Sequence, residues 1–528
     1  MRHQRGNTRT VQALLAPAAA MTLTLLAACS PVLAADPHYA LDSGARPQGV
    51  PATTTPPPPG PAAIEKPTDD LSWTDCTSRL FGQASVPAVP GVTLECASYD
   101  AELDPIAGAT GTLSIGVVRA QTPDTPTDAG PLVMTTGSDL PSSVQLPQWL
   151  SRSGSDILKT RPIVAVDRRG MGLSEAVDCR DTYERQEMQE QSQFEAGDDP
   201  VANLGAVTMT ATTSCTDTIA PGDSAYDNAH AAEDLEQLRS QWDVPSLALL
   251  GVGNGAQVAL AYAGSHPNRV ARLALDSSLP LALGAEAAAE QRVKGQQAAL
   301  DAFAAQCVAA NCPLGPDPKG AIDALLAEAR AGNGPGGASV ATLTNAIVYA
   351  LGFPQGDRVA SANSLAATLA AARAGDVGPI SGLIATANAA LNSDGRFVNS
   401  CSDALNRPTP DRVRQLVVEW GKRYPQFGAV GALDLVKCLN WPSGNAPADP
   451  KDFTVPVLLF GVQNDPIIGN EGTGAVAASI INAGSNSRRV MWQGIGHGAT
   501  IYSPCALPAL SSYIDSGKLA GTDTFCPA

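Results

Sequence analysis

The stretch LALLGVGNGAQVALAY, residues 247–262, joins an apolar run typical of a buried strand to a helix-forming run through a glycine-rich turn. Two interpretations fit it. In the first, Gly251, Gly253 and Ala256 form a G-x-G-x-x-A dinucleotide-binding fingerprint, with Asp276 closing the next apolar run at about the expected distance. In the second, residues 251–255 form a G-x-S-x-G elbow with glycine at its apex. Both belong to α/β folds, so the rest of the chain decides between them.

Short β-type runs alternate with helix-forming stretches from about residue 113 onward. The runs are TLSIGVV, GPLVMTTG, PIVAVDRRG, LALLGVG, VARLALDSS and, much later, VPVLLFGV and RRVMWQG. Near-continuous Val, Ile and Leu runs separated by helical segments indicate a mostly parallel sheet covered on both faces. We therefore expect an α/β core in two parts, residues 71–284 and 447–528.

The pattern changes between the two parts of this core. From about residue 284 to 446 the chain is rich in alanine and helix-forming, as in AEAAAEQRVKGQQAALDAFAAQC, and contains no convincing strand. Because this segment separates two strands of one predicted sheet, we expect residues 285–446 to form a large helical lid inserted before the last strands.

Charge and length limit the classes of function. The formal net charge is −17 over 528 residues, and 44% of the residues are hydrophobic. Such a chain can bury a large core. Binding to a phosphate backbone needs an excess of Lys and Arg, so nucleic acid is not expected as a partner.

The N-terminus has the features of an export signal. Three arginines precede an apolar run over residues 11–28, and the run ends in LAAC, which resembles a bacterial lipobox with Cys29 as the lipidated residue. We expect a signal peptide over residues 1–28 and a lipidated Cys29 followed by a Pro- and Thr-rich tether over residues 29–70. The protein would then be anchored to the membrane at the cell envelope. Cleavage after VLA at residues 32–34 is the alternative and would give a secreted form.

The cysteine count agrees with export. Of 11 cysteines, ten remain when Cys29 is set aside, an even number suited to an oxidising compartment. Neighbours in sequence suggest the pairs Cys76–Cys96, Cys179–Cys215, Cys307–Cys312, Cys401–Cys438 and Cys505–Cys526. The chain has no C-x-x-C motif and five scattered histidines, so we expect neither a metal site nor a cofactor.

Several motifs fall at predicted strand ends, where open α/β sheets carry their sites. VDRRGMGLS follows one strand, Asp465 follows another in FGVQNDP, and His497 follows a third in QGIGHGAT. The first motif supplies Asp167, Arg169, Gly170, Gly172 and Ser174. The order of elbow, acid and histidine is the chain order of α/β-hydrolase triads. A dinucleotide fingerprint normally opens the first βα unit, whereas here at least three strands precede the glycine turn, so the elbow is favoured.

These motifs resemble the secreted actinobacterial α/β hydrolases of the tripeptidyl aminopeptidase type, relatives of prolyl iminopeptidases, from about residue 73 to residue 526. The resemblance is carried by DRRGMGLS, AAEDLEQLR, HPNRVARLALDSSL, CLNWP, NDP and GHG. It implies an α/β-hydrolase fold in which Asp465 and His497 complete a Ser-His-Asp triad that cleaves peptides from a free N-terminus. It also implies a lid that shapes the substrate pocket, and cysteine pairs at these places.

Two departures put that activity in doubt. The family's serine falls on Gly253, which has no side chain to attack a carbonyl. The family's oxyanion loop, of the type NPGGPG, aligns with TTGSDL at residues 135–140, where only Gly137 matches. The resemblance places the oxyanion donors on the backbone of Gly137 and Asn254, and Asp139 would add negative charge beside them.

Three functions remain open from the sequence. One is a pseudo-hydrolase that keeps a lidded pocket for a peptide or small apolar ligand. A second is a residual hydrolase or peptidase in which His497 and Asp465 act as a general base. The third is a structural protein of the envelope.

Overall fold

The computed structural model describes residues 61–191 and 199–528. The predicted signal peptide, the lipidated Cys29 and most of the predicted tether lie outside the described residues. Residues 61–70, predicted as the end of the tether, pack against the core. Arg272 donates to the carbonyl of Ala62 at 2.9 Å, and the Thr68 amide donates to the carbonyl of Trp242 at 2.9 Å. These bonds hold the segment against the core, so residues 61–70 are not part of a free tether.

The core is one mixed sheet with the strand order β1-β2-β3-β5-β4-β6-β7-β8-β9-β10. Pairing is antiparallel from β1 to β3 and between β3 and β5, and parallel in all the other pairs. The strands are β1 (Thr74–Asp75), β2 (Thr93–Glu102), β3 (Thr112–Gln121), β4 (Leu132–Thr135), β5 (Ile163–Val166), β6 (Leu247–Val252), β7 (Val270–Asp276), β8 (Val457–Asn464), β9 (Ser487–Ile495) and β10 (Thr524–Cys526).

Strand β2 is absent from the strands expected from the sequence. It pairs with β3 along its whole length, from Thr93 opposite Gln121 to Glu102 opposite Thr112. Its sequence, TLECASYDAE, mixes apolar with acidic and small residues because much of the strand is exposed. An antiparallel strand near the sheet edge needs only one apolar face, so it lacks the continuous apolar run of the central strands.

Helices cover both faces of the sheet. Leu249 of β6 packs in one buried cluster with α5 (Asn228–Gln241) and α6 (Asn254–Ser265). Its neighbour Leu250 packs in another, with α2 (Ser142–Leu150) and α17 (Ala506–Ser516). Successive residues of a strand point to opposite faces, so this run of buried residues is what a sheet covered twice requires. The mostly parallel sheet predicted from the sequence is confirmed.

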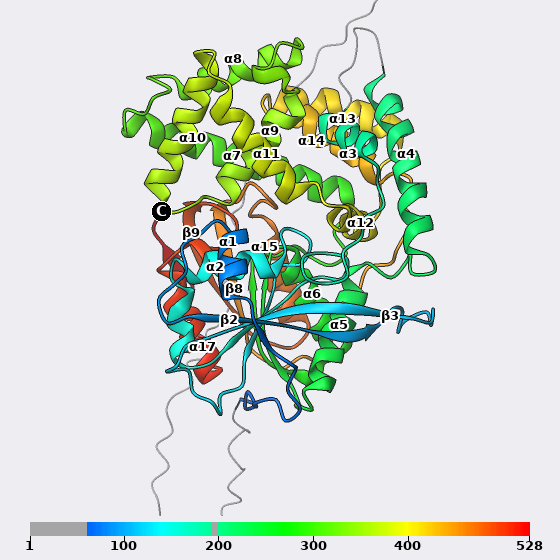
Figure 1. The fold of residues 1–528 in the computed structure, drawn as a ribbon, viewed down its shortest axis with the longest axis vertical. Helices are drawn as coiled ribbons and strands as arrows, with labels where there is room; N and C mark the ends of the chain where they lie inside the picture. The colour runs from blue at the N-terminus through cyan, green and yellow to red at the C-terminus, as the bar shows by residue number, and fades with distance from the viewer. Residues whose placement is uncertain (1–60, 192–198) are drawn as a thin grey trace, which may run out of the picture. The chain divides into compact units, whose positions relative to one another are not determined.

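A helical layer separates β7 from β8, and no strand occurs among residues 277–456, all of which the structure describes. Figure 1 shows these helices gathered together, apart from the strands. They are α7 (Ala285–Ala309), α8 (Pro318–Arg330), α9 (Val340–Gly352), α10 (Arg358–Arg373), α11 (Gly378–Leu391), α12 (Asp394–Ser402), α13 (Pro410–Arg423) and α14 (Gly428–Asp434). Their apolar side chains form a cluster of their own. We call this layer the lid.

The lid also takes in a segment that the sequence placed in the first part of the core. Helix α4 (Pro200–Ile219) buries Val201 and Leu204 in the lid cluster, and Asp199 at its start pairs with Arg414 of α13 at 2.5 Å. The short helix α3 (Thr182–Glu190) packs against α4.

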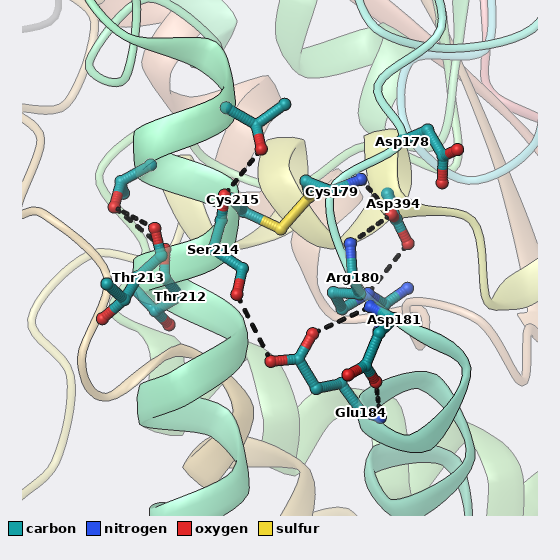
Figure 2. The surroundings of a disulfide bond; sticks show 12 residues. Asp178, Cys179, Arg180, Asp181, Glu184, Thr212, Thr213, Ser214, Cys215 and Asp394 are labelled. Atoms are coloured by element: carbon teal, nitrogen blue, oxygen red, sulfur yellow. Dashed lines mark hydrogen bonds and ion pairs between the residues drawn. A yellow bond between two sulfur atoms is a disulfide. The ribbon is translucent and has the colours of Figure 1, made fainter.

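The structure contains the five disulfides in the sequential pairing given above. One of them, Cys179–Cys215, joins the loop before α3 to α4. Figure 2 shows Asp394, the first residue of α12, facing the backbone of this loop at Cys179 and Arg180. A disulfide and a buried carboxylate therefore fasten the lid to the loop that follows β5.

Candidate functional site

The turn between β6 and α6 has the conformation of a nucleophile elbow. Gly253 has φ 60° and ψ −124°, a combination that strains any residue with a side chain. Behind it, Gly255 lies against the backbone of Thr135 in β4 so closely that a Cβ there would overlap the Thr135 carbonyl. The glycines therefore allow α6 to start tight against the sheet, with the apex of the turn at Gly253.

The predicted acid and histidine lie beside this apex. Asp465 follows β8 and His497 follows β9, and both side chains are fully buried. His497 Nδ1 is 2.9 Å from Asp465 Oδ2 and 3.1 Å from Oδ1. The carboxylate is fixed in turn by the amides of Ile467 and Ile468, both of which donate to Oδ1. This pair would orient the imidazole toward the elbow.

The other ring nitrogen of His497, Nε2, contacts a carboxylate at the place where a serine hydrolase has the serine hydroxyl. Asp139 Oδ2 lies 3.1 Å from His497 Nε2 and accepts the Asn254 amide at 2.7 Å. A Cβ built on Gly253 would overlap both Asp139 Oδ2 and His497 Nε2. The Asp139 oxygen therefore stands in the place that an elbow side chain would enter, between the imidazole and the first amide of α6.

The charges of these three groups are coupled. Burial alone would lower the pKa of His497, but the charge of Asp465 and the hydrogen bond to Asp139 raise it to about 10. Burial alone would raise the pKa of Asp139, yet the hydrogen bond and charge of His497 bring it below its ordinary value. At neutral pH the site therefore holds an imidazolium between two carboxylates.

The oxyanion loop differs from its prediction. The Gly137 amide donates to Thr135 Oγ1 at 3.3 Å, and the Ser138 amide donates to Asn254 Oδ1 at 2.9 Å. The Gly137 amide is used within the loop and the Ser138 amide is used by α6, so the structure does not support Gly137 as an oxyanion donor. Asn254 has its amide at the expected place, but that amide is already bonded to Asp139.

An elbow after the central parallel strand β6, with the acid after β8 and the histidine after β9, completes the evidence for the architecture. The chain has the α/β-hydrolase fold. The fold and the inserted helical lid agree with the expectation from the sequence.

Comparisons with known proteins agree with this fold. A family model described as TAP-like protein matches residues 424–526, the part of the chain that carries Asp465 and His497. The chain is 30% identical over 165 residues to the serine protease Hip1 of Mycobacterium tuberculosis and of Mycobacterium bovis, a match covering 30% of this chain and 32% of the relative. The chain thus matches about a third of the length of these curated relatives.

Solved structures are more distant. A bacterial membrane phospholipase A is 13% identical with a TM-score of 0.37, over 84% of this chain and 90% of that one. A thermophilic esterase from Thermogutta terrifontis is 14% identical with a TM-score of 0.37, over 80% of this chain and 97% of that one.

The motif DRRGMGLS builds the support behind the α/β-hydrolase elbow. Asp167 accepts the amides of Ser143 and Leu173, and Arg169 is fully buried in an ion pair with Asp234 at 2.6 Å. Ser174 bridges the Gly116 amide and the Asp167 carbonyl, while Gly170 and Gly172 have positive φ. These hydrogen bonds give the motif a role in holding the loop, with no group directed at His497.

Arg168, from the same motif, was not singled out in the sequence. Its Nη1 contacts Asn254 Oδ1 and lies 2.8 Å from Asp403 Oδ2 in the lid. The side chain that positions Asn254 thus also ties the elbow to the lid.

Asp276, the acidic residue of the dinucleotide interpretation, does not lie where it could bind a ribose hydroxyl. Its carboxylate is buried at the end of β7 and accepts the amides of Ala499 and Thr500, just after His497. It fixes the loop that carries the histidine, which removes the acidic element of the dinucleotide interpretation.

Residues 61–191 and 199–528, which the structure describes, contain no group of three or more His, Cys, Asp and Glu side chains placed to hold a metal ion. In the same ranges, no helix combines the length and apolar character needed to cross a bilayer.

Proposed function

We propose that the protein is an exported, lipid-anchored α/β-hydrolase-fold protein that has lost serine-dependent peptide cleavage and retains a ligand pocket. The observation that carries the proposal is the position of Asp139. Its Oδ2 bonds at once to His497 Nε2 and to the Asn254 amide, the two groups that would otherwise serve a serine and an oxyanion.

The expected loss of activity is large. Removing the nucleophile of a serine hydrolase lowers kcat by about 10⁶, and the oxyanion hole with substrate binding retains about 10³ to 10⁴ over water. Here the amide that would stabilise an oxyanion faces a carboxylate, so a developing negative charge would be repelled. The residual rate enhancement is therefore also expected to be lost.

The site disfavours a general-base mechanism using His497 and Asp465 alone. A general base needs an unprotonated nitrogen, and the pKa of His497 is raised to about 10 by Asp465 and Asp139. At neutral pH Nε2 therefore carries a proton and donates it in a hydrogen bond to Asp139, so the imidazole has no lone pair to accept a proton from water.

Export is supported by the cysteines. Five disulfides are typical of a protein that folds in an oxidising compartment. The anchor at Cys29 rests on the lipobox alone.

A structural role in the envelope needs neither the His497–Asp465 pair nor a pocket. Among the described residues, no contact favours this role over ligand binding.

Fluorophosphonate labelling tests this proposal. We expect no labelling of the purified full-length protein under conditions in which an active serine hydrolase in the same tube is labelled completely. Intact mass and peptide mapping give the readout. A stoichiometric adduct on any serine would show that a nucleophile is present and would overturn the proposal.

A further inference from the structure

The lid contains a cavity of about 450 Å³ that is distinct from the elbow. It lies between α7, α9 and the first half of α10, and Ile495 at the end of β9 also lines it. Its walls are mainly apolar side chains, including Phe303, Leu351, Leu365 and Ile495. This volume and lining are typical of small-molecule sites, which are mostly apolar with a few polar groups.

One cation stands at the rim of this lid cavity. Arg358, the first residue of α10, lines the cavity and is exposed, with its guanidinium 5.5 Å from the centre of the buried Trp492 ring. Within the part of the chain that the structure describes, it makes no hydrogen bond to protein and has no carboxylate within 4 Å.

The neighbouring Asp357 does not neutralise this arginine. Its Oδ1 accepts the amides of Val359 and Ala360 at 2.9 and 3.2 Å and so caps α10. Among the described residues, Arg358 contacts the face of the Trp492 ring and no carboxylate, so its five N–H donors remain available to a ligand.

We propose that the lid cavity binds a molecule with one hydrocarbon chain and a carboxylate head group, such as a fatty acid. The chain would lie among Phe303, Leu351 and Ile495, and the carboxylate would pair with Arg358 in the fork geometry that guanidinium favours. This proposal rests on the retained ligand pocket of the proposed function and names its ligand class.

A single segment, residues 351–354, separates the lid cavity from His497. Leu351 and Pro354 line the cavity, whereas the two residues between them contact His497. The Gly352 carbonyl accepts the His497 amide at 2.9 Å, and the Phe353 ring meets the imidazole edge-on, with centroids 5.8 Å apart. A ligand in the cavity would therefore contact residues 351–354, the segment whose Gly352 carbonyl holds the His497 amide. A spectroscopic signal of His497 would then give a second readout of binding.

The test is titration of the full-length protein, delipidated beforehand, with dodecanoate, dodecanol and dodecyltrimethylammonium by calorimetry. We expect dodecanoate to bind with one site and at least tenfold more tightly than the other two. The Arg358→Ala variant should lose about tenfold in dodecanoate affinity, the scale of one charge-assisted pair, and should bind dodecanol as the wild type does.

Two further variants complete the design. Arg373→Ala, at the exposed far end of the same helix, should bind dodecanoate normally. Ala362→Phe, which fills the cavity, should weaken binding of dodecanoate and dodecanol alike.

Three outcomes would overturn the proposal: no dodecanoate binding, equal affinity for all three amphiphiles, or equal losses in Arg358→Ala and Arg373→Ala. Fluorophosphonate labelling does not depend on Arg358 or Ala362. Failure here with no labelled serine would refute only the ligand class, and a labelled serine would refute the loss of serine chemistry whatever the cavity binds.

Discussion

Replacing Gly253 by serine and Asp139 by glycine together should raise hydrolysis of an activated ester at least about 100-fold above the wild type, whereas Gly253→Ser alone should raise it little. The single change leaves the carboxylate where the new side chain must enter, since a Cβ on Gly253 overlaps Asp139 Oδ2. The double change clears that place and frees the Asn254 amide and His497 Nε2. One oxyanion donor is typically worth about 10² to 10³ in kcat.

Initial rates with a p-nitrophenyl ester, and fluorophosphonate labelling of the new serine, give the readout. Asp139→Gly alone controls for loosening of the loop, and adding His497→Ala to the double variant should abolish the gain. If Gly253→Ser alone matched the double variant, the carboxylate would not be occupying the nucleophile's place.

The second large effect concerns the attachment of the lid. Asp394→Ala should lower the free energy of unfolding by about 3–5 kcal/mol, the usual loss when one partner of a buried ion pair is removed. The Asp394 side chain is 1% exposed and accepts hydrogen bonds from the amides of Cys179 and Arg180 and from the guanidiniums of Arg180 and Arg185. Figure 2 shows Asp394 meeting Cys179 and Arg180 beside the Cys179–Cys215 disulfide.

Although burial opposes ionisation, these donors lower the pKa of Asp394 well below its ordinary value. The alanine variant would leave the buried guanidinium of Arg180 and the half-buried guanidinium of Arg185 short of a partner. Urea unfolding followed by circular dichroism measures the change. Asp411→Ala is the matched control, because its ion pair with Arg414 has a similar distance of 2.7 Å but an aspartate side chain that is 88% exposed. It should unfold close to the wild type. Equal effects of the two variants would contradict the role given to Asp394.

The sequence allowed much of this architecture to be predicted, and for clear physical reasons. Central parallel strands are buried on both faces, so β4 to β8 appear as continuous apolar runs. Parallel strands bring their carboxyl ends to one edge of the sheet, so Gly253, Asp465 and His497 could be expected to meet although more than 200 residues separate the first two. Strand β2 and the lid role of α4 were missed because half-exposed elements carry no such run.

Unlike the architecture, the ion pair between Asp139 and His497 could not be predicted from the sequence. The loop TTGSDL showed only that a negative charge would be near the elbow. Which atom the carboxylate meets depends on the loop's conformation, which is fixed by contacts from distant segments, such as the Ser138 amide bonding to Asn254. A sequence signal does exist in hindsight: the missing serine and the added aspartate occur together, and both positions face Nε2 of His497.

The central claim is that Asp139 takes the nucleophile's place and holds His497 as a cation. The most direct test is a ¹⁵N NMR titration of the histidine side chains between pH 5 and 11, with His497→Ala to assign the signal. We expect an imidazolium up to about pH 9, in keeping with the pKa raised to about 10 by Asp465 and Asp139. Since the pKa is raised on folding, this charge stabilises the fold fully below pH 6.5 and less as the pH rises through 10. Asp139→Asn should move the midpoint down toward 6.5. A neutral imidazole at pH 7.5 in the wild type, or a midpoint unchanged in Asp139→Asn, would contradict the claim.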